Sequence, residues 1–249
     1  MSRFLLSILL LPLFCFAKEY NIGLCMMATG RYDVFAKEFI ASCRKHFFKG
    51  HNVTYFVFSD TNLEFEDDVV VVPQERLGWP HDTLKRFHTY LKHKELFANL
   101  DYIFASDADM LFVADVGEEM LGARIGTQHP GFVNKRGSYE TSPKSTAYVK
   151  KSEGKFYFAG GYYGGTRSEF IKLLETTVKK VDRDLKRGVI AVWHDESHLN
   201  RYFIDHPPTR ILSPSYCMPE RKKKWFTNQH AYPPKLIALD KDHAKLRKV

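Results

Sequence analysis

Short apolar segments alternate with stretches of helical periodicity through the first half of the chain, and this alternation limits the folds available to it. The apolar segments, which we expect to be strands, cover residues 20–27, 53–58, 69–72 and 102–106. The periodic stretches cover residues 32–48 and 82–97, with Asp82 expected to cap the second helix. This pattern predicts an α/β fold in which a mixed or parallel central sheet carries helices on both faces.

The second half of the chain is patterned less regularly. We expect a strand entering a loop at residues 126–131, a polar excursion over the surface at 133–155, and a helix at 167–185. The glycines at positions 160, 161, 164 and 165 predict a bend after the apolar residues 156–158. Residues 18–249 contain no internal repeat and no clear linker, which predicts a single domain over this range.

The apolar segment at residues 102–106 runs directly into Asp107-Ala108-Asp109. In an open α/β sheet, ligands bind at the carboxyl ends of the strands, where these two carboxylates would lie. Hard divalent cations such as Mn²⁺ and Mg²⁺ prefer oxygen ligands and keep open positions for substrate phosphates. The tripeptide therefore suggests a metal–diphosphate site, although Asp is also common in the turns that end strands.

Bulk composition restricts the class of protein and the kind of ligand. A chain of 249 residues with 44% hydrophobic content can bury a large core. Its formal charge of +8 suits an anionic ligand, and we expect no nucleic acid because no RNA-binding or zinc-finger motif is present. The chain has four cysteines, at positions 15, 25, 43 and 217. Their spacing fits neither a metal site nor a disulfide framework.

The N-terminal residues 1–17 are mostly apolar, with a single basic residue at Arg3. The apolar run is short for a membrane-spanning helix and fits the core of a signal peptide, with an uncleaved short anchor as the close alternative. Either interpretation predicts a membrane-associated or secretory-pathway protein, in the Golgi of a eukaryote or the cell envelope of a bacterium.

Several irregular blocks occur in an order that resembles glycosyltransferase family 6, which includes the blood-group A and B transferases and the α-1,3-galactosyltransferases. The resemblance covers roughly residues 21–247. The blocks are Ile22 to Leu24 followed by Ala28 to Tyr32, Trp79 with Arg86 seven residues later, Asp107 to Asp109, Gly126 to Phe132, Phe156 to Gly165, Trp193 to Asn200, and Ile211 to Pro214. The family implies a nucleotide-diphospho-sugar transferase fold of type A, with a Rossmann-like nucleotide-binding half. We expect no long stem of the kind found in animal members, so the chain resembles the compact microbial members.

The resemblance implies a donor site for a uridine diphosphate sugar. Asp107 and Asp109 would hold Mn²⁺, or another divalent metal, against the diphosphate. Lys241 and Arg247, in the basic tail, would close over the same diphosphate. The remaining implied donor contacts are Ala28, Thr29 and Tyr32 around the uridine, Trp79 and Arg86, and Asp195 on the sugar. From the residues alone, Arg86 also fits an ordinary helix-surface charge, and the tail fits a solvated terminus.

Glu196 is the implied catalytic residue, facing the anomeric carbon of the donor sugar. Family members retain the anomeric configuration, and two mechanisms remain open: Glu196 acts as a nucleophile, or it stabilises an oxocarbenium ion during same-face attack. The small residues Ala159, Gly160 and Gly161 would select the donor. Their size favours N-acetylgalactosamine over galactose, because an acetamido group needs room.

The implied acceptor residues are His129, Ser138, Trp193 and Glu196. His129 would bond a galactose hydroxyl, Ser138 stands where the family often has threonine, and Trp193 would pack on the apolar face of the acceptor. A lone histidine is otherwise more often a structural residue. Where the family has an acidic residue after the Ser-Pro block, this chain has Pro219 followed by Glu220, and the sequence leaves open whether Glu220 takes that place in the acceptor site.

Together these observations predict a retaining hexosyltransferase. It would move N-acetylgalactosamine, or else galactose, from its UDP-sugar to the 3-hydroxyl of a β-galactoside glycan in an α-1,3 linkage. Two alternatives from other classes are a catalytically weak, lectin-like glycan-binding protein and a basic structural or nucleic-acid-binding domain.

Overall fold

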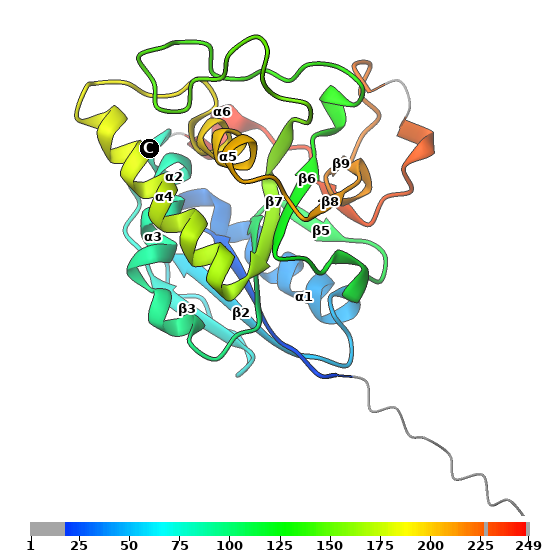
Figure 1. Ribbon diagram of the computed structural model, residues 1–249. Helices are drawn as coiled ribbons and strands as arrows, with labels where there is room; N and C mark the ends of the chain where they lie inside the picture. The colour runs from blue at the N-terminus through cyan, green and yellow to red at the C-terminus, as the bar shows by residue number, and fades with distance from the viewer. Residues whose placement is uncertain (1–17, 227–228, 248–249) are drawn as a thin grey trace, which may run out of the picture.

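A computed structural model describes residues 18–226 and 229–247, and the expected N-terminal segment therefore lies outside the described residues. Figure 1 shows a central sheet between helices on its two faces. Its strand order is β3-β2-β1-β4-β7-β6-β8. The strands are β1 (Asn21–Met27), β2 (Asn52–Ser59), β3 (Val69–Pro73), β4 (Tyr102–Asp107), β6 (Arg124–Gln128), β7 (Phe158–Thr166) and β8 (Arg210–Leu212).

The central sheet is mixed, which confirms the predicted α/β class. Strands β1 to β4 run parallel to one another, whereas β7 is antiparallel to both of its neighbours, β4 and β6. Met27 at the end of β1 pairs in register with Phe58 of β2 and with Asp107 of β4. The carboxyl ends of three parallel strands therefore reach the same edge of the sheet, where ligands bind in such folds.

Alternate residues of the strands pack into two separate cores. On β4, Phe104 belongs to the core beneath α1 (Ala36–His46), while Ile103 and Ala105 belong to the core beneath the helices on the opposite face. Those helices are α2 (His81–Leu84), α3 (Arg86–Lys92), α4 (Arg167–Leu185) and α5 (His194–Asp205). The period of two in β4 thus lets one strand bury side chains against both layers.

A second, three-stranded sheet joins the α1 side of the molecule, in the order β5-β10-β9. It consists of β5 (Met110–Phe112), β9 (Met218–Pro219) and β10 (Leu236–Ala238), and it is followed by the short helix α6 (His243–Arg247). Six 3₁₀ turns complete the described elements: η1 (Gly30–Phe35), η2 (Lys94–Phe97), η3 (Glu118–Met120), η4 (Pro130–Phe132), η5 (Pro214–Tyr216) and η6 (Gln229–Ala231).

The predicted helix at 82–97 is wrong as a single element. It divides into α2, α3 and η2, with Lys85 at φ −97° and ψ 11° between the first two. The interruption turns Leu84, Arg86 and Phe87 all toward the interior. Asp82 does not cap the helix, because its Oδ1 accepts a hydrogen bond from the Leu77 amide at 2.7 Å instead.

The predicted glycine-rich bend is also wrong, because these residues form the extended strand β7. A Cβ atom at Gly164 would lie 2.5 Å from the Ile103 carbonyl oxygen, and one at Gly165 would lie 2.3 Å from that of Ala123. The glycines therefore permit close approach to the neighbouring backbone rather than a turn.

The predicted excursion at residues 133–155 contains neither helix nor strand, but it is not wholly a surface segment, because Tyr139 and Val149 are buried with Tyr157 in a small third core. Asp184, near the end of α4, fixes it by accepting hydrogen bonds from the Ser145 hydroxyl at 2.6 Å and the Thr146 amide at 2.8 Å. Within the described ranges, no helix has the length and apolar character needed to span a lipid bilayer.

Candidate functional site

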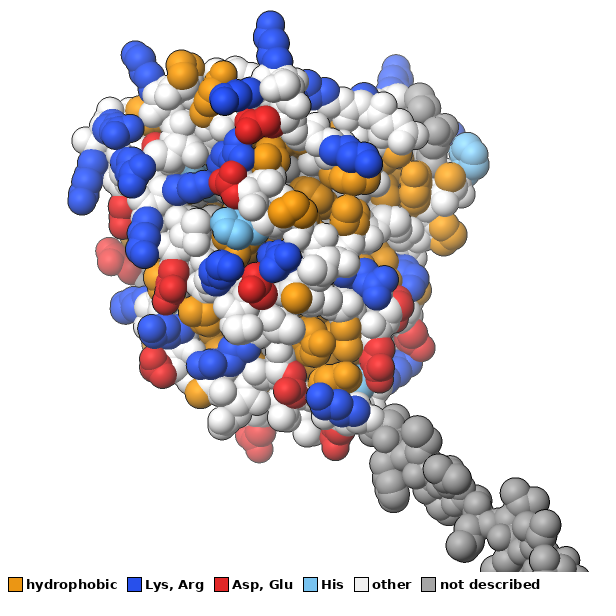
Figure 2. Space-filling model, in the orientation of Figure 1, with side chains coloured by type: hydrophobic (Ala, Val, Ile, Leu, Met, Phe, Trp, Pro, Cys, Tyr) orange, Lys and Arg blue, Asp and Glu red, His pale blue; other side chains and the backbone are white. Residues whose placement is uncertain are grey.

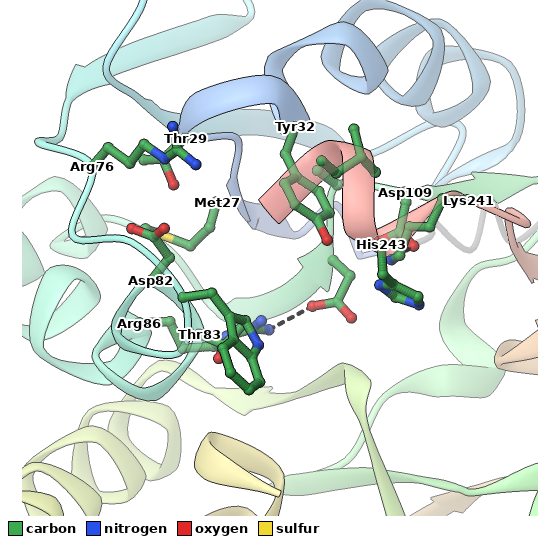
Figure 3. Close-up of a pocket in the computed structure, with 14 residues that line it drawn as sticks. Met27, Thr29, Tyr32, Arg76, Asp82, Thr83, Arg86, Asp109, Lys241 and His243 are labelled. Carbon is green, nitrogen blue, oxygen red and sulfur yellow. Dashed lines mark hydrogen bonds and ion pairs between the residues drawn. The ribbon is translucent and has the colours of Figure 1, made fainter. Parts of the chain in front are cut away.

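A cavity of about 220 Å³ opens at the carboxyl ends of β1 and β4 (Figure 3). Tyr32, Asp109 and Lys241 lie on one side of it, while Thr29 and Arg86 lie on the other (Figure 3). The lining residues are Met27, Thr29, Tyr32, Arg76, Trp79, Asp82, Thr83, Arg86, Asp107, Ala108, Asp109, Lys241, His243 and Leu246. The fold thus brings together most of the predicted donor residues from segments far apart in the sequence.

Ala28 is the predicted uridine residue that does not line this cavity. It is fully buried, its amide donates to the Phe58 carbonyl at 2.8 Å, and its own carbonyl accepts from the Ser59 hydroxyl at 2.9 Å. These bonds join the ends of β1 and β2. Ala28 therefore fixes the backbone from which Thr29 reaches the cavity.

Arg86 connects two carboxylates that come from different elements. Its Nη1 donates to Asp107 Oδ1 at 2.7 Å, at the end of β4 (Figure 3). Its Nε lies 3.0 Å from Asp195 Oδ2 in α5, an ion pair without a hydrogen bond. Because Arg86 is 5% exposed, its charge needs such partners, and it fits a buried structural and binding role rather than a surface one.

Asp109 is buried and forms an ion pair with Lys241, whose Nζ lies 5.3 Å from the centre of the Tyr32 ring. No cluster of three or more His, Cys, Asp or Glu side chains suited to a metal occurs among the described residues. The two carboxylates Asp107 and Asp109 nevertheless fit a hard divalent cation, because such an ion takes few protein oxygens and fills its other positions with water and phosphate.

Glu196 lies in the first turn of α5, next to Asp195. Its Oε1 accepts from the Tyr157 hydroxyl at 2.6 Å and its Oε2 from the Gly160 amide at 2.8 Å. Burial raises the pKa of Glu196 to about 7, although both of these donors oppose the rise. Burial also raises the pKa of Asp195 to about 6, against the opposing charge of Arg86. A site with two such carboxyl groups is typical of an active centre.

His194, the first residue of α5, adopts a positive φ of 49°. This left-handed conformation is unfavourable for a residue with a side chain, and it is found preferentially at functional sites. The His194 ring meets the half-exposed Trp79 ring edge-on, with centroids 5.1 Å apart. The contact joins α5 to the loop that carries Trp79.

Gly160 and Gly161 bring the middle of β7 close to the acidic residues. A Cβ atom at Gly160 would lie 3.2 Å from Glu196 Cβ, and one at Gly161 would lie 3.2 Å from Asp107 Oδ2. Ala159, beside them, is buried. The predicted donor-selecting residues thus belong to a strand rather than a bend, yet two of them still border the predicted catalytic and metal carboxylates.

Two of the predicted acceptor residues, His129 and Glu196, contact Tyr157, and the other two contact each other. The His129 ring centre is 5.8 Å from that of Tyr157, and His129 Nδ1 accepts from the Gly131 amide at 2.9 Å. Burial lowers the pKa of His129 to about 4, so the ring is neutral and Nε2 carries its proton. Trp193 is half-exposed and its Nε1 donates to the Ser138 hydroxyl at 2.8 Å.

Comparison with known proteins identifies the family of the chain. The profile of glycosyltransferase family 6 matches residues 8–248. The chain is 35% identical to the rat histo-blood group ABO system transferase 1, across 91% of this chain and 68% of the relative. It is 33% identical to the human globoside alpha-1,3-N-acetylgalactosaminyltransferase 1, across 91% and 68%, and 30% identical to the Escherichia coli O-antigen biosynthesis glycosyltransferase WbnI, across 89% and 95%.

The chain belongs to glycosyltransferase family 6. It is therefore a hexosyltransferase, and the mixed α/β sheet is the type A fold of that family. The family membership confirms the predicted enzyme class.

Tyr157 and Asn200 are two residues beside the predicted site for which the sequence predicts no role. Asn200 Oδ1 accepts from the Phe158 amide at 2.8 Å, while its Nδ2 donates to the Phe158 carbonyl at 2.8 Å and to the Glu196 carbonyl at 2.9 Å. It thereby fixes α5 against β7. Both residues lie inside the blocks that resemble the family. In the sequence alone, however, Tyr157 resembles a core residue of an apolar run, and Asn200 resembles a surface residue of a helix.

Trp225 is a further residue that sequence reasoning missed. It is half-exposed, and its ring centre lies 6.3 Å from that of His129. A Cβ atom at Gly131 would lie 3.4 Å from Trp225 Cζ3, so Gly131 leaves room for the indole. The available signal was a tryptophan directly after the basic run at 221–224.

The predicted lid residue Arg247 ends helix α6, but its side chain lies outside the described part of the chain. Helix α6 itself covers the cavity through His243 and Leu246. Arg31 Nη1 donates to the Lys245 carbonyl at 2.9 Å and so connects η1 with this helix.

Proposed function

We propose that this enzyme transfers N-acetylgalactosamine, with galactose as the alternative, from a UDP-sugar to the 3-hydroxyl of a β-galactoside. The transfer would retain the anomeric configuration and form an α-1,3 linkage. One observation carries the proposal: Arg86 joins Asp107 to Asp195, and the adjacent Glu196 is bound to Tyr157 beside His129. Glu196 would therefore stand between the donor cavity, which Arg86 and Asp107 line, and the predicted acceptor residues. The name of the human globoside relative supports the sugar and the linkage.

Asp107 and Asp109 would hold Mn²⁺ or a similar divalent ion at the diphosphate. When bound, that ion would act as a Lewis acid toward the leaving diphosphate. Arg86 and Lys241 add positive charge at the same cavity, and the Arg86 guanidinium suits phosphate oxygens because it donates in a planar fork.

Glu196 would act in its ionised form. Its two hydrogen-bond donors, Tyr157 and the Gly160 amide, stabilise the carboxylate and orient it. Both routes stay open, because a carboxylate held in this way serves as a nucleophile or stabilises an oxocarbenium ion. Asp195 is held by Arg86 and would accept a hydrogen bond from a hydroxyl of the donor sugar.

The donor sugar would occupy the space that Gly160 and Gly161 leave open beside the acidic residues. An acetamido group needs this volume, and any larger side chain at either position would reduce it. This space supports N-acetylgalactosamine as the preferred group.

The acceptor galactoside would bind between His129 and Trp193. The neutral His129 would donate from Nε2 to a galactose hydroxyl, while Trp193, oriented by Ser138, would pack against the apolar face of the sugar. We add Trp225 as a second aromatic contact, because it is half-exposed beside His129.

A donor screen tests this proposal. The purified enzyme is incubated with Mn²⁺, lactose and each of several sugar nucleotides, and both transfer and donor hydrolysis are measured. We expect transfer from UDP-N-acetylgalactosamine above that from UDP-galactose. Neither transfer nor hydrolysis with any donor, together with retained lactose binding, would instead support the lectin-like alternative.

We also propose that residues 1–17 direct the enzyme to the secretory pathway or cell envelope as a signal peptide or short anchor. The apolar composition of this segment supports the proposal. N-terminal sequencing of the protein recovered from cells would separate the two, because a cleaved signal peptide leaves a new N-terminus near residue 18.

A further inference from the structure

The positive charge of the chain is concentrated in two short segments beside the acceptor residues. Residues 133–155 and 179–187 together contain eleven Lys and Arg but four Asp and Glu, a net charge of +7 in a chain whose total is +8. All of these cations except Lys180 are exposed. The first segment includes the predicted acceptor residue Ser138.

The four acids in these segments do not neutralise the surface around them. Glu140 and Asp184 are buried, and both accept hydrogen bonds from backbone amides. Glu153 and Asp182 form ion pairs, each at 2.9 Å, with an arginine of α5 and a histidine of α3. The exposed cations therefore present a largely uncompensated positive field to an approaching ligand.

Hydrogen bonds hold the two segments together as one face. Ser145 of the excursion donates to Asp184 of α4 at 2.6 Å, and the Thr146 hydroxyl donates to the Lys180 carbonyl at 3.0 Å. The Val192 amide, in the loop before α5, donates to Glu140 at 2.8 Å. In Figure 2, basic side chains predominate along the top and upper left of the molecule, over the excursion and the end of α4.

Large apolar side chains are exposed at the edge of this basic face. Ile190, Val192 and Trp193 lie in the loop between α4 and α5 and are 45%, 50% and 48% exposed. Three such residues within four positions form an exposed apolar patch, and binding by charge alone does not require one. Apolar and aromatic side chains flanked by Lys and Arg are typical of proteins that lie on a membrane surface.

We propose that this basic face binds the surface of an anionic lipid membrane and so directs the acceptor site toward glycans carried on lipid. The proposal rests on the proposed transferase function, because Trp193 belongs both to the apolar patch and to the acceptor site. The cations attract anionic headgroups, and Ile190 and Val192 enter the interface. A nucleic acid or an acidic protein would use the same charge but has less need of the apolar patch.

Vesicle co-sedimentation of the full chain tests the inference. Vesicles of phosphatidylcholine alone are compared with an equal mixture of phosphatidylcholine and phosphatidylglycerol, at low and high salt. We expect more binding to the anionic vesicles than to the neutral ones, and we expect this excess to be lost at high salt. The variant K150E/K151E should bind on the order of tenfold more weakly. The control K37E/K45E, on the exposed side of α1, makes the same change in charge and should bind as the wild type does.

Two further measurements distinguish this inference from the proposed function. I190S keeps the charge and should also weaken vesicle binding, while transfer to free lactose should be unchanged in K150E/K151E. Equal binding to both vesicle types, equal weakening in the control, or retention on RNA or heparin without vesicle binding would overturn the inference. Failure of the wild type to modify lactose would overturn the proposed function, whatever the vesicles show.

Discussion

Glu196 receives two hydrogen bonds in a position where burial disfavours its charge. Burial raises the pKa to about 7, while the Tyr157 hydroxyl and the Gly160 amide lower it. Near neutral pH the group is thus poised between its two forms. This balance belongs to three residues that only the folded chain brings together, since Tyr157 and Glu196 are separated by 39 positions.

The pH dependence of turnover follows from this balance. If ionised Glu196 is required, kcat/KM should fall as the pH decreases through about 7. In Tyr157→Phe, one donor to the carboxylate is lost, so the pKa rises and the acid limb should move to higher pH by roughly one unit, about 1.4 kcal/mol. The pH profiles of the wild type and the variant measure the shift. Superimposable profiles would exclude Glu196 as the titrating group.

Donor choice is a second residue-scale prediction. A side chain at position 161 would enter the space near Asp107, so Gly161→Ser should favour galactose over N-acetylgalactosamine by about tenfold or more relative to the wild type. The control Gly117→Ser places the same atoms where the nearest neighbour is 3.7 Å away. The ratio of kcat/KM for the two donors is the readout. An unchanged ratio in Gly161→Ser would mean that the donor pocket is assigned wrongly.

At the scale of elements, β7 and α5 form one unit because Asn200 forms hydrogen bonds to both. It bonds the Phe158 backbone in β7 and the Glu196 carbonyl in α5. Each buried polar group left without a partner costs about 1–3 kcal/mol. The Asn200 amide therefore helps to fix the first turn of α5 against the sheet, together with the Gly160 amide that donates to Glu196.

Asn200→Ala should accordingly lower the free energy of unfolding by about 2–4 kcal/mol. It should also lower kcat while changing the KM for donor less. The reason is that the Glu196 backbone loses its hydrogen bond from Asn200, whereas the diphosphate contacts remain. The control Thr177→Val removes a buried hydroxyl that bonds only within α4. It should destabilise the fold less and leave kcat unchanged. Denaturant unfolding and steady-state kinetics provide both readouts; equal effects on kcat from the two variants would contradict the account.

The chain between β10 and α6 brings Lys241 to one of the two carboxylates predicted to bind metal. Lys241→Gln removes a cation that competes for Asp109, so the affinity for Mn²⁺ without nucleotide should rise. The affinity for UDP should fall, because a positive charge near the diphosphate is lost. Calorimetric titration measures both quantities, and Asp109→Asn, which removes the ligand, should lower Mn²⁺ affinity. A fall in Mn²⁺ affinity in Lys241→Gln would show that the lysine does not compete.

At the scale of the whole molecule, the parallel half was predictable because its strands and helices are local in sequence and strongly periodic. Strands β1 to β4 follow the predicted apolar segments within one or two residues. The small sheet was not predictable, since β5 and β10 are three residues long and pair Phe112 with Leu236. The prediction of a bend for the glycine-rich strand was wrong because its glycines are needed for close contact with the backbone of neighbouring segments. No local sequence pattern encodes such a contact.

The site shows the same division. The irregular sequence blocks predicted the carboxylates of Asp107, Asp109, Asp195 and Glu196, and also Trp193. The proposed roles of Trp225 and Asn200, in contrast, rest on contacts with residues distant in the sequence. Sequence resemblance predicted which residues carry the chemistry, and the packing shows which of them lie near Glu196.

The stereochemistry of the first-formed product tests this arrangement most directly. Proton NMR of the reaction with UDP-N-acetylgalactosamine and lactose follows the anomeric signals with time, and calorimetry measures UDP binding to Glu196→Gln. We predict an α-linked product from the α-linked donor, with transfer lost in Glu196→Gln while UDP still binds. A β-linked product, or transfer by Glu196→Gln at the wild-type rate, would contradict the central role given to Glu196.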